Sequence, residues 1–454
     1  MIIEMGMPYC RVTFTNKDTR MGIRKLIKSL TVPVKRFVTG SKTEITDICL
    51  LETEGVVTRF RTGLLARIQM LAPMMGLDIE NVVLHKKKDV VRIPELAAAA
   101  DRVKLRDYQE EAVRQILQHD MGVLYAATGA GKTHMAAAII AHRAIRTLFL
   151  VHTKDLLWQT KDRFEKVLGI KVGVVGDGEF EIGNVIVATI QTLHKAPPQA
   201  LQFEVDQIIQ DETHHIPADT FYSVTARFDA DYVHGLSATP YRSDGADMMI
   251  EAAAGPIRSK VTVSDLIVKG YLAKPVIRFI PIQEKTSYSA AMRYMVIRKH
   301  LVEHAVRNQV IADTARQFAS EGKSVLVAVN QVKHAEILRS VFSRTDTPVV
   351  ILDGSVHSMA RKKMLKDLQE KKTKIIISTL MKEGVDVPSL DVVINAAGGS
   401  DIMQLIGRAL RISDGKDVAT IVDFIDNQHI RLLQNSRSRM KRCKQEEAFL
   451  VVAA

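Results

Sequence analysis

The chain has 454 residues, of which 46% are hydrophobic and 25% charged, and its formal net charge at pH 7 is +12. This length predicts about three domains, and the hydrophobic content excludes a chain that is disordered throughout. No apolar run approaches the roughly 20 residues that cross a bilayer, and the start lacks the plan of a secretory signal. The three cysteines fit neither a disulfide framework nor a zinc site. We therefore expect a protein of the reducing cytoplasm with no membrane partner, and the basic charge favours a polyanion.

Residues 1–88 predict a small α+β domain. Apolar and polar residues alternate around Val12 as in a half-buried strand, and apolar residues recur at helical spacing over residues 23–30. A hairpin is expected around residues 54–55, followed by a helix over residues 64–75. The other face of the first helix is basic and carries Arg24, Lys25 and Lys28.

Residues 89–103 are expected to form a linker, and from residue 104 the pattern changes. Short apolar runs such as VLYAATG, TLFLVHT and NVIVATI alternate with helical segments, which favours parallel sheets covered on both faces. The pattern restarts near residue 275 with SVLVAVN and KIIISTL. We therefore predict two successive α/β domains, over residues 104–274 and 275–454.

The motif AATGAGKT, at residues 126–133, follows an apolar strand and opens a helix. A phosphate-binding loop needs this strand–loop–helix context, because small residues let backbone N–H groups approach phosphates and the helix N-terminus favours negative charge. Lys132 would reach the β- and γ-phosphates, and Thr133 would ligate Mg²⁺. Ala126 stands where the strict pattern has Gly, so the match is a loose one.

A pair of carboxylates, Asp211 and Glu212, ends the strand-like run VDQII. A carboxylate at a strand end can hold Mg²⁺, and its neighbour can activate the attacking water, so we assign the metal to Asp211 and the base to Glu212. In the second α/β domain, Arg408 and Arg411 are three residues apart and would share one face of a helix. Two guanidinium groups on one face suit a transferring phosphoryl group.

In this order the three elements resemble the superfamily-two helicases and translocases, over about residues 104–425. The resemblance implies two tandem RecA-like domains, use of ATP and Mg²⁺, and ATP bound between the two domains. Further short motifs match: LRDYQ at residues 105–109, VHTK at 151–154, TIQTL at 189–193, SATP at 237–240 and EGVDVP at 383–388.

The resemblance also assigns roles residue by residue. For ATP binding it implies Arg106, Gln109, Thr128, Gly129, Ala130, Gly131, Lys132, Thr133 and Asp386. For catalysis it implies Glu212, Gln404, Arg408 and Arg411. For coupling hydrolysis to movement it implies His214, Ser237, Ala238 and Thr239. A bond from His214 to Gln404 across the cleft is the favoured interpretation, and a purely structural histidine is the alternative.

The DETHH, GLSATP and KGYL segments are closer to the XPB-like and UvsW-like branch than to the DEAD-box type. With its compact size and basic N-terminal domain, the chain looks most like phage branch-migration helicases, which would place it in the host cytoplasm. Those enzymes remodel forks and Holliday junctions and resolve loops with RNA, in DNA replication, recombination and repair. The family also implies travel from the three-prime to the five-prime end.

A motor that ignores sequence needs contacts with the phosphate backbone. Hydroxyl and amide groups suited to phosphate oxygens are Thr153, Thr189, Gln191, Thr192, Asn330 and Thr379. Capping of helices or strands is the alternative role for each of them. A basic tail near the C-terminus contains Arg437, Arg439, Lys441, Arg442 and Lys444. These residues could add contacts with DNA phosphates, and a solvated charged face is the alternative.

We thus expect an ATP-dependent DNA helicase or translocase that remodels branched DNA. The alternatives are a helicase for RNA or RNA–DNA hybrids, a duplex translocase of repair or transcription, and a clamp with a decayed ATP site. Intact Lys132, Glu212 and Arg411 argue against the clamp. Junction recognition is assigned to the N-terminal domain, because a motor that tracks one strand cannot recognise a junction.

Overall fold

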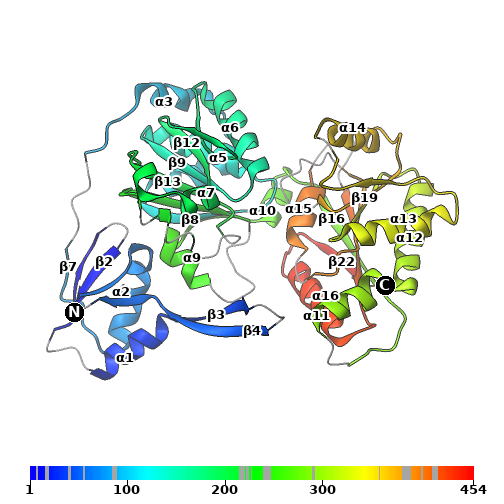
Figure 1. Cartoon of the computed structure of the whole chain (residues 1–454), viewed down its shortest axis with the longest axis horizontal. Coiled ribbons are helices and arrows are strands. Elements are labelled where there is room, and N and C mark those ends of the chain that lie inside the picture. Colours follow the sequence, from blue (N-terminus) through cyan, green and yellow to red (C-terminus); the bar gives the residue numbers. More distant parts are fainter. Residues whose placement is uncertain are drawn as a thin grey trace. The chain divides into compact units, whose positions relative to one another are not determined.

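In the computed structural model the chain divides into two compact units, Met1–Val261 and Thr262–Ala454, each described by itself (Figure 1). The structure describes the chain except residues 7–8, 16–19, 39–41, 55–56, 84–88, 214–219, 221–223, 226, 239–246, 289–291, 357, 381–389, 400–401, 412–417 and 454. For residues 34–38, 42–46, 53–54, 57, 81, 247, 358–359, 362, 369, 404, 408 and 453 it describes the backbone alone.

The N-terminal region forms the expected α+β fold. Its five-stranded sheet has the order β5-β6-β2-β1-β7, antiparallel except for the parallel pair β1–β7. These strands are Leu51–Glu54, Val57–Arg61, Tyr9–Thr13, Ile2–Glu4 and Asn81–Val83, and helices α1 (Arg20–Ser29) and α2 (Leu65–Met74) pack against them. A second hairpin, β3 (Thr31–Val38) with β4 (Lys42–Cys49), was not predicted.

The N-terminal sheet shares its hydrophobic core with helix α9 (Asp247–Ala254) of the following α/β domain, through Met249 and Ala252. Gly63 lies so close to this helix that a Cβ atom there would be 2.1 Å from the carbonyl oxygen of Glu251. At the rim, Nε of Arg67 donates to Oε2 of Glu251 at 2.8 Å. These contacts explain why residues 1–261 form one unit.

The α/β part of the first unit is built on an eight-stranded sheet of order β11-β10-β12-β9-β13-β14-β8-β15, parallel except for the edge pair β10–β11. In that order the strands are Glu179–Glu181, Gly173–Gly176, Val185–Thr189, Thr147–Val151, Gln207–Asp211, Tyr232–Ser237, Met121–Ala126 and Ile257–Val261. Every residue of β9, β12 and β13 is buried, so the centre of the sheet is covered on both faces, as the continuous apolar runs predict.

The covering helices of this sheet are α4 (Asp107–Leu117), α5 (Lys132–Arg143), α6 (Lys154–Leu168), α7 (Ile190–Lys195) and α9 (Figure 1). Short 3-10 turns lie at Ala100–Arg102 and Pro198–Leu201 in this domain and at Thr62–Leu64 in the N-terminal domain. Residues 89–103, expected to be a linker, contain helix α3 (Pro94–Ala99). Leu96 and Ala99 of α3 are buried. Ile93 N–H also donates to the carbonyl of Ala144, so this segment is attached to the α/β fold.

The second unit has a seven-stranded, wholly parallel sheet of order β18-β19-β17-β20-β21-β16-β22. The strands are Val350–Leu352, Ile375–Ser378, Val325–Ala328, Val392–Asn395, Val418–Ile425, Lys274–Pro281 and Leu450–Ala453. The helical segments are α10 (Val263–Val268), α11 (Arg293–Ile297), the π-turn Arg298–Val302, α12 (Ala305–Ser320), α13 (Val332–Ser343), α14 (Ser358–Gln369), α15 (Met403–Ala409) and α16 (Ile430–Lys444).

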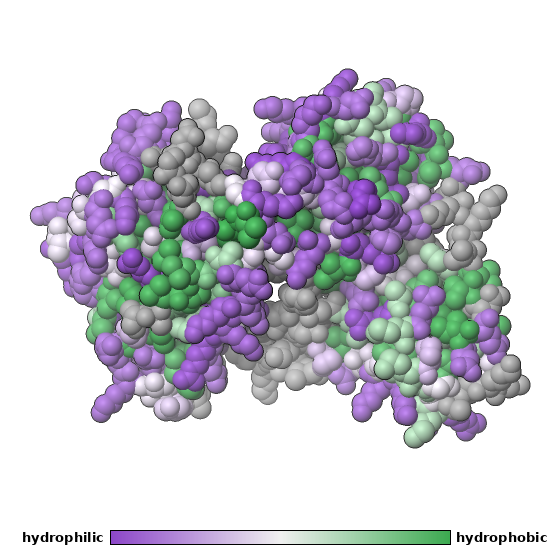
Figure 2. Space-filling view, turned by 180° about the vertical axis from the view of Figure 1, so that it is seen from behind, coloured by the Kyte–Doolittle hydropathy of each residue, from purple (hydrophilic) through white to green (hydrophobic). Residues whose placement is uncertain are grey.

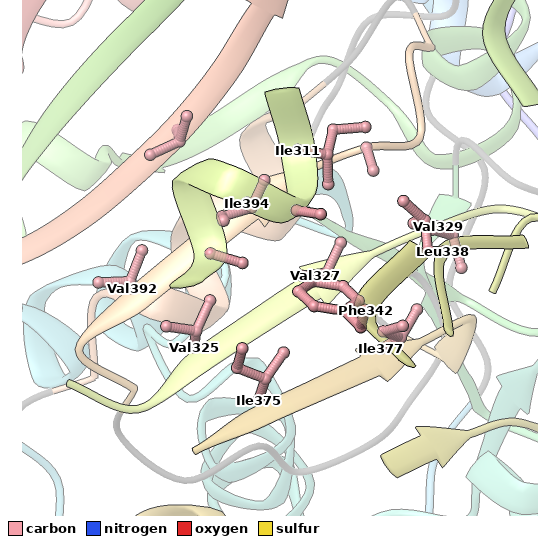
Figure 3. Close-up of a cluster of buried hydrophobic side chains, with 14 of the residues drawn as sticks. Ile311, Val325, Val327, Val329, Leu338, Phe342, Ile375, Ile377, Val392 and Ile394 are labelled. Carbon is pink, nitrogen blue, oxygen red and sulfur yellow. The ribbon is translucent and has the colours of Figure 1, made fainter. Parts of the chain in front are cut away.

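The core of the second unit lies between its sheet and helices α12 and α13. Figure 3 shows Val325 and Val327 of β17 beside Ile375 and Ile377 of β19, with Phe342 of α13 packed over them. These side chains are fully buried. The fold class expected from the sequence, two tandem parallel α/β domains after a small α+β domain, is confirmed.

Hydrophilic residues cover much of the face drawn in Figure 2, and the hydrophobic residues that appear there form separate patches. Among the described residues, no helix combines the length and the apolar character that crossing a membrane requires.

The tight approach of Gly63 to α9 makes a stability prediction. Gly63→Ala is expected to lower the free energy of unfolding of the first unit by about 1–3 kcal/mol, because the added methyl group meets backbone atoms that cannot rotate away. Trp158, the sole tryptophan, lies in this unit and reports its unfolding by fluorescence in urea. The matched control is Gly183→Ala, whose Cβ would meet its neighbours at 3.4 Å or more. Equal midpoints for both variants would contradict this close packing.

Candidate functional site

The candidate site of the first unit lies at one edge of its sheet, where the parallel strands end at their carboxyl termini. Neighbouring strands end there in the order β10, β12, β9, β13, β14, β8. The last three lead into Asp211–Glu212, Ser237–Ala238 and the loop 127–131, which we call the nucleotide half. The first three lead into Asp177, Thr189 and Thr153. We call this part the strand half, after the DNA strand that its residues are predicted to contact. In open α/β sheets this edge is where ligands bind.

The loop after β8 has the geometry of a phosphate cradle. Gly129 and Gly131 adopt φ values of 91° and 82°, which lie in the region that favours glycine, and Gly131 caps α5. Within the described part of the chain, the amide N–H groups of Gly129, Gly131, Lys132 and Thr133 donate to no protein acceptor. A helix N-terminus with such unpaired donors is suited to bind an anion.

Two side chains of helix α4 hydrogen-bond to the backbone of this loop. Both the Tyr108 hydroxyl and Nε2 of Gln109 donate to the carbonyl of Ala130, at 3.1 and 2.9 Å. Oε1 of Gln109 in turn accepts the backbone N–H of Arg106 at 2.9 Å. Gln109 is buried and Arg106 is exposed. The side-chain amide of Gln109, which is predicted to contact adenine, thus also supports the loop after β8. Tyr108 gives a second supporting hydrogen bond, which the sequence interpretation missed.

The two carboxylates lie beside the lysine of the loop. Nζ of Lys132 is 3.1 Å from Oε1 of Glu212, and the backbone N–H of Glu212 donates to Oδ1 of Asp211 at 3.0 Å. Glu212 has a φ of 48°, a strained value for a residue with a side chain, and such strain concentrates at functional sites. Burial, and next the neighbouring Glu212 carboxylate, raise the pKa of Asp211 to about 7, while Lys132 opposes this rise.

These residues fit a magnesium ion that arrives with nucleotide. A carboxylate whose pKa is raised by burial, and next by a second carboxylate, gains from an added cation, and Asp211 and Thr133 carry oxygen atoms of the kind that Mg²⁺ prefers. Among the described residues, no group of three or more His, Cys, Asp and Glu side chains could hold a metal by itself. Mg²⁺ typically takes one or two protein ligands together with substrate phosphates, which matches this sparse set.

Two of the predicted coupling residues belong to the nucleotide half. Ser237 is the last residue of β14 and is fully buried, and Ala238 follows it. Thr128 lies in the phosphate loop, half-buried. His214, Thr239 and Asp386 lie outside the described residues, as do the side chains of Gln404 and Arg408, so their roles stay predictions.

The strand half brings together the four candidate contacts of the first unit. Oγ1 of Thr153 accepts the backbone N–H of Leu156 at 3.3 Å, so this residue caps α6. The hydroxyls of Thr189 and Thr192 are 2.7 Å apart, and Nε2 of Gln191 donates to the carbonyl of His152 at 3.1 Å. The capping alternative therefore describes one role of Thr153, and a hydroxyl that caps a helix can still donate its own proton to a phosphate.

In the second unit, the candidate contacts follow adjacent parallel strands. Asn330 comes after β17 and Thr379 after β19. Nδ2 of Asn330 donates to the carbonyl of Ala397 at 3.1 Å, and the backbone N–H of Thr379 donates to the carbonyl of Leu352 at 3.1 Å. The sheet thus brings both residues to its carboxyl edge.

The helix expected to carry both arginines is shorter than predicted. Helix α15 ends at Ala409, so Arg408 lies on it and Arg411 lies beyond it. The backbone of Arg411 instead forms an antiparallel bridge with Leu272, and the carbonyl of Leu410 accepts the N–H of Ala273 at 2.8 Å. The shared helix face predicted for the two arginines is therefore wrong, because strand-like pairing takes over the backbone groups that would continue the helix.

One residue of the basic tail is misassigned by the sequence interpretation. Arg439 of α16 is fully buried, and its Nε donates to Oδ2 of Asp423 at 2.7 Å, so it cannot grip DNA. Arg307 is likewise buried and donates to Oδ1 of Asp426 at 2.7 Å. The two guanidinium groups also donate to the carbonyls of Gly399 and Ala396, which lie between β20 and α15. The sequence feature that could have revealed the burial of Arg439 is helical spacing, because Arg439 lies on one face of α16 with the buried residues Leu432, Ser436 and Cys443.

Comparison with known proteins agrees with this geometry. Residues 102–242 match the family described as type III restriction enzyme, res subunit, and residues 307–413 match the helicase conserved C-terminal domain. The solved structure of Saccharomyces cerevisiae Dbp5 bound to RNA and ADP BeF3 shares the fold, with a TM-score of 0.56 at 17% identity over 80% of this chain and 94% of that one.

Two relatives align over most of their own length. The DNA 3'-5' translocase XPB2 of Sulfurisphaera tokodaii is 29% identical over 74% of this chain and 86% of the relative. Helicase D10 of Escherichia phage T5 is 22% identical over 84% of this chain and 87% of the relative. Three further relatives are longer, and the chain spans 48% to 62% of their length. The chain belongs to the superfamily-two helicases, as an ATP-dependent helicase or translocase with XPB-type and phage helicases among its relatives.

Proposed function

We propose that this motor remodels branched DNA by fork regression, Holliday-junction branch migration and unwinding. The observation that carries the proposal is the attachment of a basic domain to the first α/β domain through a shared hydrophobic core. Helix α1 contains no Asp or Glu, and its exposed residues Arg24, Lys25 and Lys28 pair with none of the described carboxylates. Because the N-terminal sheet shares a core with α9, a contact made by α1 would move together with the motor sheet.

The proposed chemistry uses the nucleotide half of the sheet edge. Lys132 and the free N–H groups of the loop bind the phosphates, and Glu212 orients and deprotonates the attacking water. Asp211 and Thr133 would hold Mg²⁺, which neutralises charge on the phosphates when it is bound. Arg408 and Arg411 of the second unit, with Gln404, are proposed to stabilise the charge that develops during transfer. Asp386, and Arg106 with Gln109, are proposed nucleotide contacts.

Movement is proposed to follow from the arrangement of the two halves. A single DNA strand would contact Thr153, Thr189, Gln191 and Thr192 on the strand half, and Asn330 and Thr379 in the second unit. Because β9 and β13 are hydrogen-bonded neighbours, a change at Asp211–Glu212 adjoins the strand contacts after β9. His214, Ser237, Ala238 and Thr239 are the proposed relay between hydrolysis and strand grip.

The substrate is tested by comparing ATP-driven action on a fork, a Holliday junction, a blunt duplex and an RNA–DNA hybrid of matched sequence. Processing of the fork and the junction, with little action on the other two, supports the proposal. Preferred action on the hybrid would favour the RNA-directed alternative. ATP hydrolysis stimulated by blunt duplex without strand separation would favour a duplex translocase of repair or transcription.

Lys132→Ala is expected to abolish ATP hydrolysis and leave most DNA binding, because the strand contacts lie on the other half of the edge. Hydrolysis is measured as phosphate release with and without single-stranded DNA, and binding by anisotropy of a labelled strand. The exposed residue Lys166, changed to Ala, serves as the control. Wild-type hydrolysis by the Lys132 variant would remove the phosphate-loop assignment.

Arg411→Ala is expected to lower kcat by about 10³- to 10⁵-fold with a small change in nucleotide affinity, because an arginine finger acts on charge present in the transition state. The backbone bridge to Leu272 does not depend on the side chain, so the fold should persist. Single-turnover hydrolysis and nucleotide titration separate the two effects, with the exposed residue Arg344 changed to Ala as control. An unchanged kcat with a lower melting temperature would make the residue structural.

Replacing Arg24, Lys25 and Lys28 together by Gln is expected to weaken junction binding and spare hydrolysis stimulated by a plain single strand. Each phosphate contact that is lost should make the slope of log affinity against log salt about 0.9 less steep. The control carries Arg24→Lys, Lys25→Arg and Lys28→Arg, which keep the charge. Substitution is preferred to deletion of residues 1–88, because deletion would uncover Met249 and Ala252. An unchanged slope would exclude α1 from the DNA contact.

A further inference from the structure

The sole tryptophan of the chain, Trp158, lies in the second turn of α6 at the carboxyl edge of the first sheet. Its Nε1–H donates to Oδ2 of Asp177 at 3.1 Å, and Asp177 directly follows β10. Trp158 is 37% exposed. Among the described residues, no aromatic ring and no cation stacks on the indole.

The pairing of β10 with β12 fixes where this indole lies. Val175 of β10 is paired in parallel with Ala188 of β12, so Gly176 lies beside Thr189. The contact is close, because a Cβ on Gly176 would be 2.8 Å from Oγ1 of Thr189. Asp177 therefore leaves the sheet at the level of Thr189, and it brings the Trp158 indole to the same level. Trp158 thus belongs to the strand half of the edge, on the helix that Thr153 caps.

Asp177 holds the indole in one orientation. Its carboxylate accepts from Trp158 and also pairs with Nζ of Lys154 at 2.5 Å, and the hydrogen bond from Lys154, followed by that from Trp158, lowers its pKa. Asp177 has a φ of 54° in the tight turn between Gly176 and Gly178, which aims the carboxylate back at α6. With its single N–H satisfied, the indole has only its ring face left for a further partner.

We propose that Trp158 stacks on an unpaired base of the single DNA strand held at the strand half. The inference rests on the strand path proposed above and adds a base contact to a set otherwise limited to the backbone. Stacking on an aromatic ring tolerates any sequence, because every base offers a π-face, so it suits a motor. An indole clamped by Asp177 loses little further freedom on binding, which favours the stacked state.

The test uses the intrinsic fluorescence of Trp158, which no other tryptophan obscures. Wild-type protein is titrated with an oligothymidylate and with a strand of equal length whose sugars lack bases. Binding of both is measured independently by anisotropy of an end label. We expect quenching by the oligothymidylate at saturation and little change with the abasic strand. Saturated binding of oligothymidylate without a fluorescence change would overturn the stacking, and absence of any DNA binding would instead remove the proposed function.

Variants extend the test to affinity. Trp158→Ala should weaken oligothymidylate binding between about fivefold and about 100-fold, as the loss of one base stack predicts, while Trp158→Phe should keep most of it. Both variants should bind the abasic strand as the wild type does, so the effects of removing the ring and the bases should not add. The exposed residue Tyr288 in the second unit, changed to Ala, is the control. Equal weakening of both strands by Trp158→Ala would mean a structural role and overturn the inference.

Discussion

The parallel pairing of six strands in the first unit is the constraint on which the site depends. Parallel neighbours end at the same edge, so the loops after β10, β12, β9, β13, β14 and β8 must lie side by side, although they are spread from Ala126 to Ala238 in the sequence. The order of the β-strands therefore separates the side chains at this edge into two groups. The glycine-rich loop, its lysine and the acidic residues occupy one half of the edge, and hydroxyl, amide and aromatic side chains occupy the other. A motor needs its nucleotide contacts and its DNA contacts close together, and the neighbouring strands β9 and β13 place the two halves of the edge side by side.

The nucleotide half places two neighbouring carboxylates, Asp211 and Glu212, close to one lysine, Lys132. Burial, and next the Glu212 carboxylate, raise the pKa of Asp211, while Lys132 and the backbone N–H of Glu212 oppose this rise. Nucleotide phosphates accompanied by Mg²⁺ would bring a cation to the aspartate and give Lys132 a stronger partner than Glu212. That exchange would release Glu212 for the attacking water. The hydrogen bonds from Tyr108 and Gln109 to the carbonyl of Ala130 hold the backbone of the loop in place.

The second unit uses buried charge for a different purpose. Arg307 and Arg439 are fully enclosed and paired with Asp426 and Asp423, and they also hold carbonyl groups of the segment that leads into α15. Removing one partner of such a pair leaves an uncompensated charge in the core, which typically costs about 3–5 kcal/mol. The network therefore fixes the start of the helix that carries Arg408, in the way that the N-terminal sheet fixes α9 in the first unit.

The central strands of the two α/β sheets, the glycine-rich loop, the carboxylate pair and the family could be predicted from the sequence, because each depends on a local pattern. Continuous apolar runs, a glycine-rich turn before a helix and acidic residues at a strand end keep their meaning without distant partners. The folded structure was needed to show that α15 stops at Ala409, that Arg439 is buried, that residues 1–88 share a core with α9, and that Trp158 lies level with Thr189. These features arise from pairing between segments far apart in the chain, such as Leu272 with Arg411, and such pairing leaves no periodic trace in either segment alone.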